Sequence, residues 1–328
     1  MKYLSLLLLL LVIPASTATT ERNTIDIMEW TVPWDDTRPR DPYTESANRV
    51  WFCGQQGEYL ARLDPTTGEF QRYELGSGAG PHNLIVDSDG SVWFAGNLNS
   101  YIGKLNPENG DIKKYPMPDS AARDPHTLVF DDLGNIWFTV QGGNFIGRLN
   151  KASGVIDLVK VPTSGARPYG IKMDSNNVPW IVEFGSHKLA TIDPETLVLQ
   201  EIALPREEAR PRRMEIDSND AIWYVDYANG MIGRYDQSTA QFQEWETPGG
   251  ANSRPYGTAM DDQDRLWFVE SGLQPNQFIG FDPSTDDFFS ITPIESGGGT
   301  VRHMYYYAPA QEIWFGTDTN TIGRTKIP

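Results

Sequence analysis

The feature that most constrains the fold is a repeat of about 43 residues that occurs seven times along the chain. Each copy carries a Trp followed by an aromatic or aliphatic residue, and successive copies are 42 to 47 residues apart. The seven pairs are Trp51-Phe52, Trp93-Phe94, Trp137-Phe138, Trp180-Ile181, Trp223-Tyr224, Trp267-Phe268 and Trp314-Phe315. This period is typical of propeller blades, which bury their apolar faces only against neighbouring blades.

Each copy contains the pattern of four short strands. A Pro stands twelve residues before six of the Trp residues, and Arg302 is taken to replace it in the seventh copy. Residues 84–86 form the first strand and residues 87–90 a turn of Asp, Ser and Gly. A second strand then carries Trp93, and a third and a fourth follow at 101–105 and 111–115. Such runs between turns favour antiparallel strands. The sequence therefore predicts an all-β, seven-bladed β-propeller with four-stranded blades.

The two ends of the repeat series predict how the ring closes. The seventh copy stops after its third strand, at residues 321–324, whereas residues 24–30 resemble a fourth strand without a blade of its own. Placing this N-terminal strand on the last blade removes an exposed strand edge. We expect residues 19–328 to form one propeller domain.

The N-terminus has the pattern of a signal peptide, for which we predict residues 1–18. A basic residue at position 2 precedes an apolar run at 3–14 and small residues at 15–18. A membrane anchor is the alternative, but the run is short for a bilayer and no other hydrophobic stretch follows. We expect a secreted or periplasmic protein without a membrane span.

Charge excludes some classes of partner, and cysteine content indicates how the fold is stabilised. The formal net charge of −17 disfavours nucleic acid and anionic membranes. The single cysteine, Cys53, leaves no intrachain disulfide, so stability must come from packing. The chain carries no Gly-x-Ser-x-Gly, His-Glu-x-x-His or Cys-x-x-Cys motif. We expect a monomer that meets a small or oligomeric, polar or anionic substrate.

Polar residues recur at one position of the repeat, directly after the Pro. The start of a blade's first strand and the end of its second strand lie at the same end of the barrel, so these side chains should share one axial mouth. They are Arg40, His82, His126, Tyr169, Arg212, Tyr256 and His303. Strand ends add Glu183, Asp226, Glu270 and Asp318, and arginines precede the Pro at Arg38, Arg167, Arg210 and Arg254. This pattern predicts a polar binding or active site.

Three of the four histidines fall in this ring, which predicts a metal site. We expect His82, His126 and His303 to share one divalent ion, and imidazole ligands favour Zn²⁺, Fe²⁺, Mn²⁺ or Cu²⁺ over Mg²⁺. The alternative is that each histidine only hydrogen-bonds a neighbouring carboxylate. Each arginine, likewise, either contacts substrate or bridges to an acid of the adjacent blade.

The repeat resembles that of the streptogramin B lyases, also called virginiamycin B lyases, over essentially the whole mature chain. The motifs that carry the resemblance are Arg167-Pro168-Tyr169-Gly170-Ile171, Asp89-Gly90-Ser91-Val92-Trp93-Phe94 and Ile146-Gly147-Arg148. The resemblance implies a seven-bladed propeller that opens a cyclic depsipeptide antibiotic by elimination at its ester, with Mg²⁺ bound on one axial face. The family's Glu-x-His of the last blade corresponds to Val301 and His303. Its Pro-His of the sixth blade corresponds to Pro255-Tyr256, and its last acid to Asp318.

These observations leave two functional hypotheses. The first is a metal-assisted lyase, or a hydrolase of esters or lactones, with little or no cleavage of a streptogramin B. Its chemistry would use His303, Tyr256, Glu270 and Asp318, and its substrate would be held by Arg40, Tyr169, Arg212, Arg213 and Arg254. The second is a non-catalytic propeller that binds a peptide, a saccharide or another anionic ligand over the same face.

Overall fold

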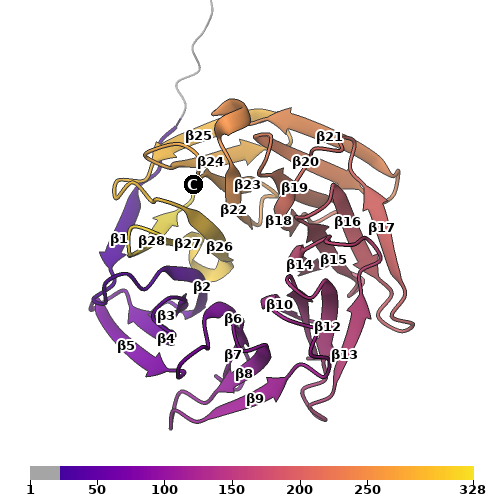
Figure 1. Ribbon diagram of the computed structural model, residues 1–328. Coiled ribbons are helices and arrows are strands. Elements are labelled where there is room, and N and C mark those ends of the chain that lie inside the picture. Colours follow the sequence, from indigo (N-terminus) through magenta and orange to yellow (C-terminus); the bar gives the residue numbers. More distant parts are fainter. Residues whose placement is uncertain (1–22) are drawn as a thin grey trace, which may run out of the picture.

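The computed structural model describes residues 23–328, which fold into seven four-stranded antiparallel sheets arranged as blades around an axis (Figure 1). Within this range the only helical segments are two 3₁₀ turns, Gly250–Asn252 and Ala308–Ala310. The seven-bladed propeller predicted from the repeat is confirmed. No helix among the described residues is long and apolar enough to cross a membrane. The predicted signal peptide, residues 1–18, lies outside the described residues.

The strands follow the repeat from the axis outward. The innermost strands are β2 (Pro39–Ser46), β6 (Pro81–Val86), β10 (Pro125–Phe130), β14 (Pro168–Met173), β18 (Pro211–Ile216), β22 (Pro255–Met260) and β26 (Val301–Tyr307). The second strands are β3 (Arg49–Gly54), β7 (Val92–Gly96), β11 (Ile136–Val140), β15 (Pro179–Glu183), β19 (Ile222–Asp226), β23 (Leu266–Glu270) and β27 (Glu312–Thr317). The third strands are β4 (Tyr59–Asp64), β8 (Tyr101–Leu105), β12 (Phe145–Leu149), β16 (Lys188–Ile192), β20 (Met231–Asp236), β24 (Gln277–Asp282) and β28 (Thr321–Lys326). The outer strands are β5 (Glu69–Glu74), β9 (Ile112–Pro116), β13 (Ile156–Lys160), β17 (Leu199–Ala203), β21 (Gln241–Glu246), β25 (Asp287–Pro293) and β1 (Ile27–Thr31).

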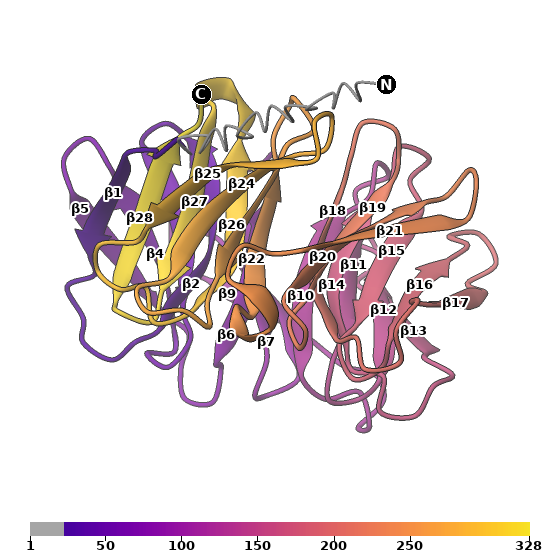
Figure 2. The same ribbon diagram turned by 90° about the horizontal axis from the view of Figure 1, so that it is seen from above.

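The N-terminal strand closes the ring, as the sequence predicts. β1 pairs antiparallel with β28, in register from Ile27 opposite Thr325 to Thr31 opposite Thr321. Figure 2 shows the two strands side by side at the edge of the last blade. Trp30 of β1 also stacks on Trp314, with ring centroids 5.5 Å apart. The blade is therefore held by both ends of the chain.

The repeated Trp residues are tied to the turns that precede them. In five blades the indole N–H donates to the Asp that lies six residues earlier, as Trp267 does to Asp261 at 2.8 Å. In the first and last blades a Glu accepts instead. All seven rings are buried. Each Trp thus fills the space between blades while its one polar atom stays hydrogen-bonded.

The last blade departs from the sequence-based alignment by one residue. Val301 lies opposite Thr317, as Pro255 lies opposite Glu270 in the blade before. The hairpin between β26 and β27 is one residue longer than the hairpin between β22 and β23. Counting twelve residues back from Trp314 therefore reaches Arg302 instead of Val301. The prediction that Arg302 replaces the Pro was therefore wrong. Val301 does so, and Arg302 rather than His303 follows it.

Candidate functional site

A bulge near the start of each inner strand shapes the axial site. All seven pairings between first and second strands shift register within the first residues after the Pro position. A bulge redirects side chains, and residues at two successive positions meet across the axis. We call the first position the first layer: Arg40, His82, His126, Tyr169, Arg212, Tyr256 and Arg302. The second layer is Asp41, Asn83, Thr127, Gly170, Arg213, Gly257 and His303.

The first layer is packed shut rather than open. The rings of His82 and His126 lie with centroids 3.4 Å apart, and His126 lies 3.9 Å from Tyr169. The hydroxyls of Tyr169 and Tyr256 are hydrogen-bonded, and the Arg212 guanidinium lies 3.9 Å from the Tyr256 ring centre. The two histidines and two tyrosines are all buried. The predicted ring exists in six blades, but its side chains fill the channel.

The second layer is an ion-pair network centred on Asp41, a residue that the sequence analysis did not single out. Its carboxylate accepts from Arg40 Nε at 2.9 Å, Arg213 Nη2 at 3.2 Å and Asn83 Nδ2 at 3.0 Å. Burial alone would raise the pKa of Asp41, but Arg40 and Arg213 hold it below its ordinary value. Arg213 also donates to Thr127 and to the Arg302 carbonyl. The network thus joins Asp41 to Arg213, which are 172 positions apart in the sequence.

The histidines are neutral in this environment. Burial is the main cause that lowers the pKa of His82 and His126 well below 6.5, and the guanidiniums of Arg40 and Arg213 lower it further. Burial also lowers the pKa of His303, to about 3, although Asp41 partly opposes the shift. At neutral pH all three imidazoles are therefore in the uncharged form.

The predicted three-histidine metal site does not fit this arrangement. His82 and His126 face each other ring to ring, His126 Nδ1 is hydrogen-bonded to Thr127 at 2.8 Å, and His303 belongs to the other layer. Guanidiniums surround the three rings and would repel a dication. Across residues 23–328, no three His, Cys, Asp or Glu side chains are grouped so that they could hold a metal ion. The metal remains a prediction, and no chemical step is derived through it.

The acids that end the second strands hold loops. Glu183 accepts from Ser186 at 2.6 Å, Asp226 from Arg206 at 3.0 Å and from the Arg210 amide, and Glu270 from the Gly249 amide at 2.7 Å. The three carboxylates are buried. Mg²⁺ prefers carboxylate and water oxygens, whereas Asp226 and Glu270 brace the links between blades and Glu183 braces the turn that follows it. The other oxygen of Glu183 is buried without a hydrogen-bond partner. Thr317, which takes the corresponding position in the last blade, is not an acid.

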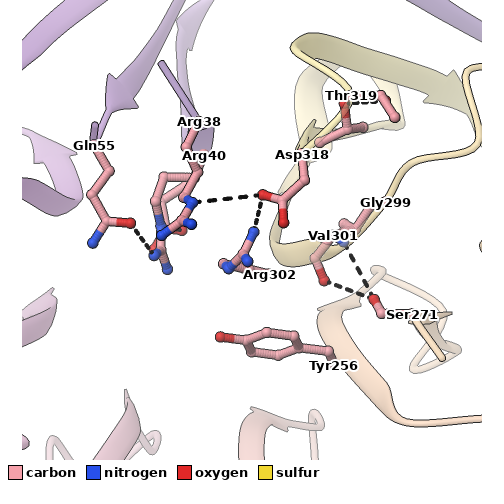
Figure 3. A network of polar contacts seen from close by, with 12 residues as sticks. Arg38, Arg40, Gln55, Tyr256, Ser271, Gly299, Val301, Arg302, Asp318 and Thr319 are labelled. Carbon is pink, nitrogen blue, oxygen red and sulfur yellow. Dashed lines mark hydrogen bonds and ion pairs between the residues drawn. The ribbon is translucent and has the colours of Figure 1, made fainter. Parts of the chain in front are cut away.

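The axial surface above the first layer is rich in arginine. Asp318, one residue beyond Thr317, forms an ion pair with Arg302 and lies 3.9 Å from Arg38 (Figure 3). Arg40 lies beside them and donates Nη1 to Gln55 at 3.0 Å, whereas its buried Nη2 has no hydrogen-bond partner. Burial and the neighbouring Arg302 lower the pKa of Arg38. We call Arg38, Arg40, Arg302 and Asp318 the arginine mouth.

Other predicted substrate-binding arginines stack on aromatic rings. The Arg212 guanidinium lies within 5.2 Å of the ring centres of Tyr169, Phe184, Tyr227 and Tyr256. Arg254 lies 6.0 Å from Tyr227. The arginines at the axis thus separate into those that stack on aromatic rings, Arg212 and Arg254, and those that meet carboxylates in the mouth, Arg38, Arg40 and Arg302.

The charge around the axis opposes that of the whole chain. The two layers with Arg38 and Asp318 contain five guanidiniums, from Arg38, Arg40, Arg212, Arg213 and Arg302, and two carboxylates, from Asp41 and Asp318. The chain as a whole carries a formal charge of −17. This local excess of positive charge identifies the mouth as a candidate site for an anion. The sequence analysis did not name Asp41, which is adjacent to Arg40, and it named Arg302 only as the replacement of the Pro and not as a site residue.

The chain is similar to solved lyases over most of its length. Virginiamycin B lyase from Staphylococcus aureus is 25% identical, with a TM-score of 0.84 over 93% of this chain and 100% of that chain. A catalytically inactive His-to-Ala variant of that enzyme with quinupristin is 26% identical, with the same TM-score over 93% of this chain and 100% of that chain. An extracellular two-component-system domain from B. thetaiotaomicron shares only the fold, at 13% identity and a TM-score of 0.71 over 92% of this chain and 43% of that chain.

The family assignment rests on the sequence as well as on the fold. No curated protein sequence matches the chain significantly. The sequence profile of the Virginiamycin B lyase family matches residues 18–277, which is more than half of the chain. The match spans the first five blades and the first two strands of the sixth. The chain belongs to the virginiamycin B lyase family.

Proposed function

We propose that this propeller binds a small ligand with two or more carboxylates at the arginine mouth. The observation that carries the proposal is the excess of guanidiniums over carboxylates around the axis of a strongly acidic chain. Guanidinium groups hold carboxylates through paired, charge-assisted hydrogen bonds. Secretion, which rests on the pattern of residues 1–18, would bring the mouth to ligands outside the cytoplasm.

The contacts of Asp318 support this choice of ligand chemistry. Its carboxylate lies between Arg38 and Arg302, so these two side chains are already spaced to meet a carboxylate (Figure 3). The side chains of Arg38 and Asp318 are 36% and 28% exposed, which leaves them open to a ligand from solvent. The unpartnered Nη2 of Arg40 offers a further donor below them. A dicarboxylate could share Arg38 and Arg302 with Asp318 and engage Arg40 on rearrangement of its side chain.

Elimination is the second candidate function, and the phenol pair of Tyr169 and Tyr256 favours it. Burial alone would raise the pKa of Tyr169, but Arg212, Arg213 and Arg40 lower it below its ordinary value. A phenolate in this position would be a base for a proton next to a substrate carboxylate. Both rings are buried, so a substrate would first have to displace side chains of the first layer.

Streptogramin cleavage is not part of the proposal. The resemblance places Tyr256 and Val301 where the family has His and Glu, and His303 lies in the second layer beneath packed side chains. A metal-assisted step is also left out, because the residues present do not fit the ion.

Calorimetric titration with citrate tests the binding function. We expect citrate to bind and triethyl citrate, which lacks the carboxylates, not to bind. The double variant Arg38→Ala/Arg302→Ala should weaken citrate binding at least tenfold, since it removes two charge-assisted contacts. Arg49→Ala is the matched control, because Arg49 is 51% exposed and pairs with Glu45 away from the mouth. Equal binding of the ester, or no loss in the double variant, would overturn the proposal.

Turnover is tested separately with an oligogalacturonate, an anionic saccharide. In elimination, the base removes the proton next to the carboxylate and the C–O bond to the neighbouring sugar breaks, with that sugar as leaving group. The resulting carbon–carbon double bond is conjugated to the carboxylate and absorbs ultraviolet light. If absorbance rises, Tyr169→Phe should abolish the increase, because it removes the base, while leaving citrate binding within about twofold. Citrate binding without any rise in absorbance favours the non-catalytic propeller.

A further inference from the structure

A cavity of about 270 Å³ occupies the central channel beyond the second layer. All seven inner strands contribute to its lining, so it lies on the axis visible in Figure 1. The lining runs from Asn83 and His303 of the second layer to Phe130, the last residue of β10. The first layer seals the end near the arginine mouth. The cavity therefore opens at the opposite axial face, where the Lys172 side chain is 38% exposed.

Most of the lining is apolar or aromatic. Ile85, Val129, Ile171 and Met214 contribute aliphatic side chains. Tyr43 and Tyr305 lie together near the open end, with ring centroids 4.5 Å apart. An engineered apolar cavity of roughly 150 Å³ holds benzene. A molecule of two fused rings therefore fits a cavity of about 270 Å³.

The charges in the lining are balanced within the protein. Arg213 donates to Asp41, Thr127 and the Arg302 carbonyl. Lys172 pairs with Glu215 at 2.6 Å, and the other oxygen of Glu215 accepts from Thr258 at 2.9 Å. An ionic ligand would have to break one of these pairs or remain uncompensated in a confined space. The cavity therefore suits a neutral molecule.

One polar atom in the lining is left without a partner. The Nδ1 atom of His303 is buried and makes no hydrogen bond, although its imidazole lines the cavity. A buried polar atom of this kind costs free energy until it meets a donor or acceptor. A turn of the imidazole about its Cβ–Cγ bond would bring this atom to the cavity, where a ligand hydroxyl at the inner end would satisfy it.

We propose that the channel cavity is a second binding site, for a neutral aromatic molecule of about two fused rings with one hydroxyl group, and that His303 receives this hydroxyl. The rings lie between the aliphatic side chains and the Tyr43–Tyr305 pair. The site is separate from the arginine mouth, because the packed rings of the first layer and the ion pairs of Asp41 close the channel between them. It does not depend on the function proposed for the mouth.

The test uses 2-naphthol, naphthalene and 2-naphthoate as probes, with affinities measured by calorimetry or by quenching of tryptophan fluorescence. We expect 2-naphthol to bind, and 2-naphthoate to bind at least tenfold more weakly because its charge has no free partner. His303→Phe should weaken 2-naphthol about two- to tenfold, the range for one neutral hydrogen bond. The same variant should leave naphthalene unaffected or bound slightly more tightly.

A variant that fills the cavity tests whether 2-naphthol binds there. Val129→Trp fills the lining, and Val155→Trp is the matched control because Val155 is 57% exposed on a turn outside the lining. The first should abolish 2-naphthol binding and the second should not. Circular dichroism checks that both variants fold, and the three-probe comparison remains decisive if Val129→Trp does not. No binding of 2-naphthol at its solubility limit, tighter binding of 2-naphthoate, or competition by citrate would each overturn the proposal.

Discussion

The two ends of the central channel are built from the same seven strands but differ in how their charges are compensated. At the arginine mouth, the guanidiniums outnumber the carboxylates and Arg40 retains an unpartnered donor. In the channel cavity, Arg213 and Lys172 are paired, and the orphaned atom belongs to the neutral His303. The same repeat therefore supplies two different charge environments, and we infer that the unpaired charge at each end, rather than the backbone, sets the class of ligand it would bind.

Opening the ring should disrupt both ends and gives the largest expected effect. Deletion of residues 24–33 removes β1, its hydrogen-bond ladder with β28 and the stacking of Trp30 on Trp314. The exposed edge of β28 would then favour aggregation. We expect the melting temperature to fall by more than about 10 °C, as measured by differential scanning calorimetry. An unchanged melting temperature would show that β1 is dispensable for closure.

The second largest effect is expected from a variant that breaks the ion pairs of the second layer. Arg213→Ala leaves Asp41 buried without the guanidinium that reaches it from across the axis. Arg40 still pairs with Asp41 in this variant, so the loss should be that of a hydrogen bond to a charged group, about 1.5–3 kcal/mol, and the urea midpoint should fall. Arg49→Ala, at an exposed pair, should cost less than about 1 kcal/mol. Similar losses in the two variants would argue against a separating network at Asp41.

Lowering the pH should change the free energy of unfolding in opposite directions through the histidines at the axis and through the carboxyl groups that brace the loops. Burial lowers the pKa of His126 and raises that of Glu183 to about 7. As the pH falls below about 6.5, the unfolded chain gains a proton at His126 that the folded chain does not, so the free energy of unfolding falls. At Glu183 the folded chain gains the proton first, so the free energy of unfolding rises.

Each group should contribute about 1.4 kcal/mol per pH unit within its window. Denaturant titrations from pH 6.5 to 5 should therefore show a flatter loss of stability for His126→Phe than for the parent. Glu183→Gln should show a steeper loss. Slopes that change in the same direction in both variants would contradict these assignments.

The smallest effect is expected with a streptogramin B itself. Tyr256 and Val301 replace the His and Glu of the family pattern, and the first layer covers His303. Incubation with quinupristin, followed by mass spectrometry, should show no linearised product above the background without protein. Rapid linearisation would mean that the first layer opens to a large substrate, and it would remove the distinction between the two ends of the channel.

The sequence carried enough information for the scaffold because the scaffold repeats. Each Trp and its preceding turn report the same local geometry, so seven copies confirm one another. Closure by β1 was also predictable, because a blade with three strands and an N-terminal strand without a blade leave one natural pairing. The inner positions were predictable in six blades. The prediction failed in the seventh blade, where a longer hairpin places His303 one position further along the inner strand than expected.

The closed state of the axial site was not predictable from the repeat. Counting from the Pro places His82 and His126 at the mouth, but it does not show that their rings fill it. The central ion pair joins Asp41 to Arg213 across the axis, and no local pattern marks residues so far apart as neighbours. Bulges, which bring the second position to the axis, have no sequence signature here beyond the Pro itself.

The central claim is that the arginine mouth is an anion site, and a crystal structure with citrate tests it most directly. Crystals grown with citrate at about ten times its measured Kd should show a carboxylate of the ligand on Arg38 and Arg302, beside Asp318. The channel cavity should contain no citrate. Citrate bound in the channel cavity, or an arginine mouth without citrate when calorimetry shows binding, would contradict the account.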